Sequence, residues 1–234
     1  SLQLASKHPF VDKMPKLPED TVVGIDLNVK NFLTDSNKKV VNNPKYYRRM
    51  EYKLNYAKRK MSKRQARAKK EKRPLAKAKN YQKQRLLVAR LSRKITNQRK
   101  NFLHELAKAY LKNHEIVVAE ELRSKNLLKN HKIAKSLQDV GHRTFLTLLE
   151  QKAQMYGRIF ITVNPKNTTQ TCSACGHIMR DKDKLTLKDR EWTCPVCHTH
   201  HDRDYNASVN ILKRGLSILY KQTSVGNARI NCIS

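Results

Sequence analysis

The sequence predicts an α/β fold, in which the strands of one sheet alternate with helices along the chain. Three short apolar segments rich in β-branched residues, at 21–27, 115–122 and 158–165, have the pattern of strands. Segments with apolar residues at helical spacing lie between and after them. A long basic region and a module with two cysteine pairs interrupt this order. We therefore expect an α/β core that carries two insertions.

The predicted strands follow one another in a simple order. TVVGIDL is followed by NFLTDSNKKVV, where Ser36-Asn37 separates two apolar runs and predicts a β-hairpin. EIVVAEEL predicts a strand after the basic region. RIFITVNP predicts a further strand, which Pro165 ends because proline cannot donate a hydrogen bond to a neighbouring strand.

The basic region, residues 44–113, contains no glycine and holds most of the formal net charge of +31. Residues 53–73 predict a mostly polar helix, and Pro74 marks its end. A second, amphipathic helix is predicted by Leu87, Leu91, Ile95, Phe102 and Leu106. We interpret the region as a helical hairpin. Charge runs are usually solvated faces of mixed sign, but here one sign dominates, which favours contact with phosphates.

Two more helices are predicted on the C-terminal side. Residues 136–157 end at a glycine, a common helix stop, and carry Leu137, Val140, Phe145, Leu148 and Leu149. Residues 204–220 carry Ile211, Leu212, Leu216 and Leu219. The tail, residues 223–234, shows no clear element and contains an unpaired cysteine, Cys232.

Charge and composition limit the classes of partner. A sequence pI of about 10.2 predicts attraction to polyanions, beyond what a merely soluble surface needs. An anionic membrane is the rival polyanion, but the sequence has no apolar run of about 18 residues. The first 20 residues also lack the apolar stretch of a secretory signal. We expect an intracellular protein that binds nucleic acid.

The cysteine module predicts a metal site. Cys172-x2-Cys175 and Cys194-x2-Cys197 are separated by 18 residues, a spacing that in an intracellular protein favours a metal over disulfides. Four thiolates about 2.3 Å from one ion make a tetrahedral zinc site with no place for water, so we expect one structural zinc. Gly176 suits the turn after the first pair. Alternative ligands nearby are His177, His198, His200 and His201.

Three acidic residues stand where neighbouring residues predict burial. Asp26 lies inside VVGIDL, where an unpaired carboxylate is costly, and Glu120 has the same place in IVVAEEL. Because side chains alternate along a strand, only one of Glu120 and Glu121 shares a face with Asp26. Asp204 begins the last helix on the face that carries Ile211 and so points toward the sheet. Three hard oxygen donors at the ends of three elements suit Mg²⁺.

Each acid also has an ordinary structural explanation. Asp204 can cap its helix, and Asp26 and Glu120 can pair with some of the 50 Lys and Arg residues. The three together, spaced across the order of elements expected of a ribonuclease-H-like core, favour metal binding.

Four segments in order carry a specific resemblance to a known family: GIDLNVKNF, VVAEELRSKNL, NPKNTTQTCSACG and DRDYNASVNIL. From about Val22 to Leu212 the chain resembles TnpB, the RNA-guided nuclease of bacterial insertion sequences, which is related to type V CRISPR effectors. The resemblance implies a RuvC-like, ribonuclease-H fold with a zinc ribbon inserted before the last catalytic helix. The ribbon would thus deliver Asp204 to the active site.

Carried over by motif, the catalytic residues implied are Asp26 of GIDL, Glu120 of the EEL motif and Asp204 of the D-x-N-A motif, with Asp202 outside the site. They would hold two Mg²⁺ ions for hydrolysis of DNA. The partners implied are single-stranded DNA, such as a strand displaced by the guide, and a guide RNA. We expect no membrane and no small-molecule substrate, and a place in the bacterial or archaeal cytoplasm, at the nucleoid.

The chain departs from the family pattern at three places. Asn28 follows GIDL where the family usually has Gly, and His198 follows Cys197 where Gly is common. The first catalytic strand begins only about 20 residues in, whereas family members carry a long N-terminal half that holds the guide RNA. We expect either a fragment or a natural short form, with the catalytic triad complete.

This interpretation divides the chain into five parts: an N-terminal linker (1–20), a RuvC-like nuclease core (21–43, 114–170 and 201–222), a basic helical insert (44–113), a zinc ribbon (171–200) and a tail (223–234). The expected function is RNA-guided, Mg-dependent endonuclease cleavage of DNA. Two alternatives stay open: a guided repressor that binds without cleaving, and a basic zinc-ribbon structural protein. Three intact acids disfavour the first, and acids buried in two strands disfavour the second.

Overall fold

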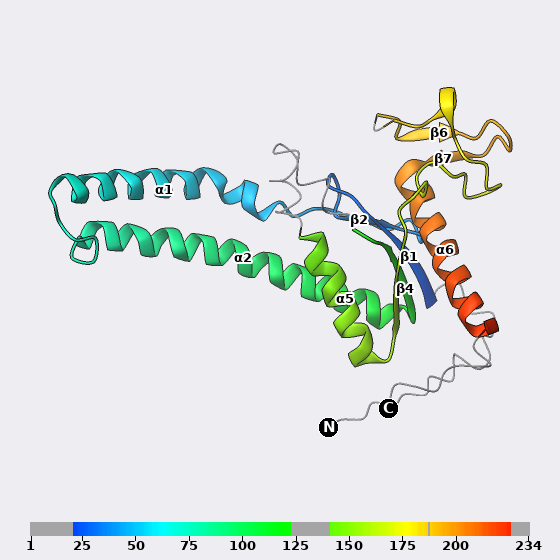
Figure 1. The fold of residues 1–234 in the computed structure, drawn as a ribbon, viewed down its shortest axis with the longest axis horizontal. Helices are drawn as coiled ribbons and strands as arrows, with labels where there is room; N and C mark the ends of the chain where they lie inside the picture. The colour runs from blue at the N-terminus through cyan, green and yellow to red at the C-terminus, as the bar shows by residue number, and fades with distance from the viewer. Residues whose placement is uncertain (1–20, 123–140, 187, 226–234) are drawn as a thin grey trace.

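The computed structural model describes residues 21–122, 141–186 and 188–225, and its centre is one five-stranded mixed sheet (Figure 1). The strands are β1 (Val22–Leu27), β2 (Leu33–Asp35), β3 (Val40–Val41), β4 (Ile116–Glu120) and β5 (Ile159–Val163). Their order is β3-β2-β1-β4-β5. The strands β1, β4 and β5 are parallel, whereas β2 and β3 are antiparallel to their neighbours. The α/β class that the sequence predicts is confirmed.

In the described part of the chain, one face of the sheet is covered by the helix α6 (Arg203–Val225). Residues of β1, β4 and β5 form a core with Ile211 of the helix: Val22, Ile116, Val118 and Val163. The helix backbone lies very close to the strands, because a Cβ on Gly24 would overlap the carbonyl group of Ser208. A Cβ on Gly215 would likewise overlap Val118. These two glycines let α6 sit directly on β1 and β4.

The other face of the sheet packs against α2 (Lys79–Asn113) and α5 (His142–Tyr156) (Figure 1). Its largest buried side chains include Ile25, Phe32, Leu103, Leu111, Phe145 and Leu149. The apolar positions expected at 145, 148 and 149 are buried as predicted. Leu137 and Val140, the other two of that set, lie outside the described residues.

The basic region forms two antiparallel helices that extend away from the sheet (Figure 1). The first, α1 (Tyr46–Lys70), starts and ends earlier than the predicted 53–73. A small apolar cluster of Leu54, Ala57, Leu91 and Ile95 joins it to α2. The predicted inward position of Leu87 is wrong: its side chain is 42% exposed. The C-terminal part of α2, with Leu103 and Leu111, belongs instead to the core of the sheet.

The cysteine module is a small unit between β5 and α6. It contains a 3-10 helix, η2 (Asp181–Asp183), and the antiparallel strands β6 (Glu191–Thr193) and β7 (His200–Asp202). Its own core consists of Cys172, Met179, Trp192 and Cys194. β7 leads into α6 without an intervening residue, so this module stands directly on the N-terminal end of that helix (Figure 1). Cys232 lies outside the described residues.

None of the helices that the structure describes combines the length and the apolar character needed to cross a membrane.

Candidate active site and metal centre

Two of the predicted acids stand side by side at the ends of neighbouring parallel strands. Ile25 of β1 pairs with Ala119 of β4, so Asp26 and Glu120 come next in register. Each acid lies two residues after a position that faces α6 and therefore points to the same side. On β1 that position is Gly24, which contacts the helix, and on β4 it is Val118, which packs in the core beneath the helix. Asp26 is buried and Glu120 is partly buried. The sheet therefore presents both carboxylates on the face covered by α6.

Glu121, the alternative to Glu120, points to the opposite face. It lines a cavity of about 270 Å³ together with Arg143 and Leu146 of α5 and Phe160 of β5. The alternation along β4 thus separates the two neighbouring acids. Only Glu120 shares the α6 face with Asp26.

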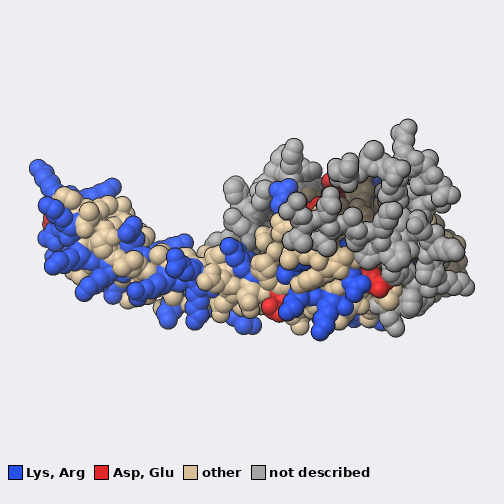
Figure 2. Space-filling model, turned by 90° about the horizontal axis from the view of Figure 1, so that it is seen from below, with Lys and Arg blue, Asp and Glu red and all other residues tan. Residues whose placement is uncertain are grey.

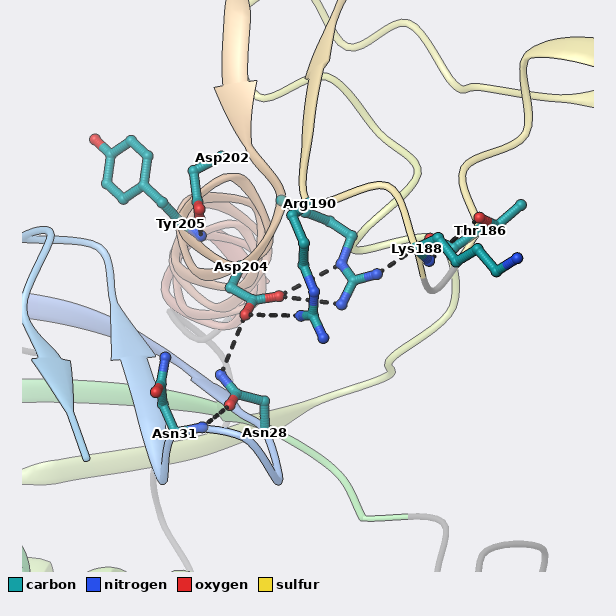
Figure 3. Close-up of polar contacts among 9 residues, drawn as sticks. Asn28, Asn31, Thr186, Lys188, Arg190, Asp202, Asp204 and Tyr205 are labelled. Carbon is teal, nitrogen blue, oxygen red and sulfur yellow. Dashed lines mark hydrogen bonds and ion pairs between the residues drawn. The ribbon is translucent and has the colours of Figure 1, made fainter. Parts of the chain in front are cut away.

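The third predicted acid, Asp204, lies in the first turn of α6 and contacts three polar side chains (Figure 3). Nη1 of Arg190 lies 3.4 Å from its Oδ2 atom, and Nη2 of Arg203 lies 3.3 Å from its Oδ1 atom. Asn28 donates a hydrogen bond of 3.5 Å to Oδ2. Asp204 therefore joins the loop after β1 to the cysteine module.

The three acids interact electrostatically. Burial raises the pKa of Asp26 well above its ordinary value, and the charges of Glu120 and Asp204 raise it further. Arg203 and a hydrogen bond from Asn28 oppose this shift. Like charges around a buried carboxyl disfavour its ionised form, and a bound cation would remove that penalty.

Glu120 has a partner of its own. Burial raises its pKa, whereas a hydrogen bond from the Thr168 hydroxyl and the charge of Arg214 lower it. Thr168 lies after β5, in the segment that leads to the first cysteine pair. A buried carboxylate held by a hydroxyl is fixed in direction.

The donor chemistry of the three acids suits magnesium, which takes carboxylates, waters and phosphate oxygens. They do not form a compact nest, since among the described residues only the four cysteines bring three or more ligand atoms within 4.8 Å of one another. Ligands of a single Mg²⁺ lie about 2.1 Å from it. Two ions about 4 Å apart accommodate a wider set of carboxylates. The three acids are therefore not close enough together to ligate a single ion, and a site that they share would need more than one ion.

Sequence reasoning did not identify several residues around these acids. Arg190 and Thr168 carry no motif that marks them, because each meets its acid across a long separation in the chain. Asn28 was noted only as a departure from the family pattern, and here it contacts Asp204. Of these residues, only Arg203 could have been suspected from the sequence, because it directly precedes Asp204.

The four cysteines converge as the spacing predicts. Sγ of Cys172 lies 3.6 Å from that of Cys197, and Cys175 and Cys194 are also 3.6 Å apart. These distances are too long for disulfides. Four sulfurs at about 2.3 Å from a central zinc stand about 3.8 Å from one another, so the thiol set fits tetrahedral zinc.

Two matching turns shape this centre. Gly176, after the first pair, has φ 79°, and His198, after the second pair, has φ 57°. Hydrogen bonds with the side chain and the backbone of Thr199 lower the pKa of Cys197 to about 6. A backbone hydrogen bond lowers the pKa of Cys175, but desolvation and the neighbouring thiols raise it overall to about 12. The support for a zinc site is therefore the convergence of the four sulfurs and not the pKa of any one thiol.

Of the four histidines considered as ligands, His201 lies nearest to a ligand sulfur. Its Nε2 atom is 3.1 Å from Sγ of Cys172, and Trp192 packs on its ring at 4.7 Å between centroids. His200 instead pairs with Glu191 at 3.7 Å, on the exposed side of the two strands. A ring nitrogen at hydrogen-bond distance from a coordinating sulfur stabilises its negative charge. His201 thus has a supporting place beside the complete thiol set.

Two family models match the chain. One, described as "Probable transposase" (OrfB_IS605), matches residues 6–131, which is more than half of the chain. The other, described as "Cas12f1-like, TNB domain", matches residues 142–211, from α5 to α6.

Relatives named as RNA-guided endonucleases match across most of the chain. A protein of Streptomyces pristinaespiralis named "Putative RNA-guided DNA endonuclease" is 36% identical over 208 residues, covering 88% of this chain and 48% of its own length. "Putative RNA-guided DNA endonuclease InsQ" of Escherichia coli K12 is 26% identical over 220 residues, covering 88% and 52%. The chain spans about half the length of these curated relatives.

A solved structure shares the fold. The chain matches the "Cryo-EM structure of the Cas12f1-sgRNA-target DNA complex" with a TM-score of 0.52 and 22% identity, over 85% of this chain and 51% of that one. At this identity the match bears on the fold alone. The family assignment rests instead on the family models and the relatives. They show that the chain belongs to the TnpB family, the OrfB group of probable transposases.

Proposed function

We propose that the chain is the nuclease portion of an RNA-guided DNA endonuclease, in which Asp26, Glu120 and Asp204 are the catalytic acids. The observation that carries this proposal is geometric: the parallel register of β1 and β4 places Asp26 and Glu120 side by side on the face that α6 covers, and α6 carries Asp204 in its first turn. Burial and the charges of Glu120 and Asp204 raise the pKa of Asp26, and an acid whose pKa is raised by neighbouring acids is typical of functional sites. The names of the relatives support the same activity.

The proposed core is ribonuclease-H-like, of the RuvC kind. The strand order β3-β2-β1-β4-β5, with α6 packed on one face, supports it. We propose that the core consists of residues 21–43, 114–170 and 201–222, with a basic insert at 44–113 and a zinc ribbon at 171–200. The continuous run of α2 from the hairpin into the sheet would couple the insert rigidly to the core.

Each side chain has a distinct part in the proposed hydrolysis. Asp26, Glu120 and Asp204 would bind Mg²⁺, which supplies an activated water and stabilises the leaving oxygen. Thr168 holds Glu120, and Asn28 holds Asp204. Arg190 and Arg203 form ion pairs with Asp204, and if a cation took over that carboxylate, both guanidinium groups would be available to contact the phosphate.

The basic helices would attract the substrate. Figure 2 shows Lys and Arg side chains along the hairpin, with few acids among them. A surface on which positive charges dominate binds the phosphates of both DNA and RNA, and this binding weakens as the salt concentration rises. We propose DNA as substrate and a guide RNA as partner, because one similar solved structure is titled as a complex with an sgRNA and target DNA. This substrate would place the protein at the nucleoid.

The zinc centre is proposed to be structural. With all four ligand positions taken by cysteine, no coordination place would remain for water or substrate. One zinc per chain would hold the ribbon, which has only a small apolar core of its own.

The test is cleavage of labelled single-stranded DNA with Mg²⁺, comparing Glu120→Gln with Glu121→Gln. The two residues are neighbours of equal charge on opposite faces of β4. We expect Glu120→Gln to lose at least about a hundredfold in rate, since a metal ligand contributes several kcal/mol to the transition state. Glu121→Gln should cut as the wild type does.

DNA binding is measured in parallel, by fluorescence anisotropy, and should be equal in both variants. A wild-type chain that binds DNA yet does not cut it with any divalent ion would favour the alternative function, a non-cleaving repressor or structural protein. Equal cutting by both variants would place the active site elsewhere.

A further inference from the structure

We propose that Thr168 is a positioning residue for Glu120, and that Asn210 and Asn206 connect it to the first cysteine pair. The cysteine module would then set the direction of a catalytic acid through a continuous chain of hydrogen bonds. This inference rests on the proposed function, since it concerns the metal-binding role of Glu120.

The first link is a side-chain contact between Thr168 and Glu120. The Thr168 side chain is only 2% exposed, and its hydroxyl donates to Oε1 of Glu120. The same oxygen lies 3.2 Å from the carbonyl of Pro165. A hydroxyl has one proton, and a carboxylate accepts it more strongly than a neutral carbonyl does. One carboxylate oxygen of Glu120 is therefore held, and the other stays available to a cation.

The second link fixes the backbone of Thr168. The amide of Asn210, on α6, donates to the carbonyl of Thr168 at 2.9 Å and to that of Thr171 at 2.6 Å. Asn210 is 8% exposed. Its amide protons thus hold both ends of the turn between β5 and the first cysteine to one helix. A small movement of α6 or of that turn would change the place of the Thr168 hydroxyl.

The third link reaches the metal centre. Asn206, whose side chain is fully buried, accepts a hydrogen bond of 2.8 Å from the backbone N–H of Ser173 and donates one of 2.8 Å to the carbonyl of Thr171. Ser173 lies between Cys172 and Cys175, so the hydrogen bonds of Asn206 hold in place the turn that supplies two of the proposed zinc ligands. Buried amides with both ends satisfied are rigid, because breaking either bond leaves an unpaired polar group.

Together these contacts run from the first cysteine pair, through two asparagines of α6, to Glu120. Hydrogen-bond partners of metal ligands typically set metal affinity by about 10- to 100-fold. Thr168 has this relation to Glu120, although it binds no ion itself. Its role differs from general support of the fold, because it acts on one carboxylate oxygen.

The experiment measures Mn²⁺ binding directly, by the loss of the free-ion signal in electron paramagnetic resonance, on zinc-loaded protein. Three variants are compared: Thr168→Val, Thr168→Ser and Thr171→Val. The last is the matched control, because its hydroxyl donates to the carbonyl of Asn167 within the same turn and not to Glu120. Zinc content and the melting temperature show that each variant is folded.

We expect Thr168→Val to weaken Mn²⁺ binding about tenfold, and Thr168→Ser, which restores the hydroxyl, to bind as the wild type does. Thr171→Val should also bind Mn²⁺ normally. Equal losses in Thr168→Val and Thr171→Val would overturn the inference, because the turn as a whole would then matter rather than one hydroxyl. A failure of serine to restore binding would do the same.

A double-mutant cycle tests the link to α6. Asn210→Ala should weaken Mn²⁺ binding in the wild type and have no further effect in Thr168→Val, because it acts through that residue. If the losses of Mn²⁺ affinity caused by Asn210→Ala and Thr168→Val add fully in the double variant, Asn210 does not act through Thr168 and the inference is overturned. Failure of the proposed function has another signature: Glu120→Gln would then bind Mn²⁺ as tightly as the wild type does, and both proposals would fall together.

Discussion

The guanidinium of Arg190 lies 3.4 Å from the carboxylate of Asp204, which connects the cysteine module to the first turn of α6 (Figure 3). Arg203 approaches the other oxygen of the same carboxylate at 3.3 Å. Asp204 is thereby neutralised by two fixed positive charges. A divalent cation that binds Asp204 has to compete with both.

Removal of Arg190 should therefore tighten divalent binding. We predict that Arg190→Ala binds Mn²⁺ about two- to fivefold more tightly in the absence of DNA, the range expected for loss of one partly exposed ion pair. The control is Arg158→Ala, which breaks a similar pair with Glu115 at 3.4 Å at a distance from the acids. Calorimetric titration measures both, and unchanged or weaker binding by Arg190→Ala would contradict the prediction.

The metal-free chain should lose stability as the pH rises. Burial, and then the charges of Glu120 and Asp204, raise the pKa of Asp26 above its ordinary value. A carboxyl with a raised pKa in the folded state stabilises it most below its ordinary pKa, and that contribution is lost as the pH rises through the raised value. We predict that Asp26→Asn melts at a higher temperature than the wild type at neutral pH and depends less on pH.

Thermal melting between pH 4 and pH 8, roughly the range in which a raised carboxyl titrates, measures this effect without added divalent ions. Mg²⁺ should raise the Tm of the wild type and leave Asp26→Asn unchanged, because a ligand stabilises only the state that binds it. The same variant should lose cleavage by at least about a hundredfold. A variant less stable than the wild type across the whole range would refute the assigned charge repulsion.

The two turns at the cysteine centre should respond to substitution in opposite directions. Gly176 and His198 both have left-handed backbone angles, at φ 79° and 57°. We predict that His198→Gly stabilises the centre by about 0.5–1 kcal/mol and that Gly176→Ala destabilises it by about 1–2 kcal/mol. A Cβ at residue 176 would meet no atom within 4 Å, so the second effect is backbone strain alone.

Zinc transfer to a chromogenic chelator measures these changes as a slower release from His198→Gly and a faster one from Gly176→Ala. One zinc per chain should be released in each case, and Cys175→Ser should retain little. Equal rates of zinc release from the wild type, His198→Gly and Gly176→Ala would show that the backbone strain of the two turns does not affect zinc binding.

The hairpin should set the salt dependence of DNA binding. Arg59, Lys63 and Lys70 are exposed on α1 at spacings of four and seven residues, on one side of the helix. Their joint replacement by alanine keeps helix propensity and should reduce the slope of log K against log salt by about 2 for single-stranded DNA, at about 0.7 per lost phosphate contact. The control removes the same charge elsewhere, at Lys166, Lys184 and Lys188. An equal change in both triple variants would mean that overall charge, not the hairpin, determines binding.

The sequence identified the acids and cysteines because their chemistry conflicts with their surroundings. Asp26 lies next to the end of the otherwise apolar β1 and Glu120 ends the otherwise apolar β4, and the parallel pairing of Ile25 with Ala119 brings them together. The rest depends on contacts that no local pattern encodes. Thr168 meets Glu120 across 48 residues, and Arg190 reaches Asp204 only because the cysteine module folds back.

The helical hairpin shows the same limit. Apolar spacing predicted the second helix, but periodicity alone could not show where its packing partner changes from α1 to the sheet. Leu87 is exposed and Leu111 is buried on the same helix, because the partner face differs at its two ends. The close contacts at Gly24 of β1 and Gly215 of α6 could not be predicted either, since a missing side chain leaves no apolar signal.

The direct passage from β7, which ends at Asp202, into α6, which begins at Arg203, has a consequence for protein engineering. One residue inserted between Asp202 and Arg203 would rotate the ribbon by about 100° relative to the helix. This rotation would move Arg190 away from Asp204. A ribbon transplanted from another protein therefore has to match the helical phase as well as the zinc ligands, and a flexible tether between the two would uncouple them.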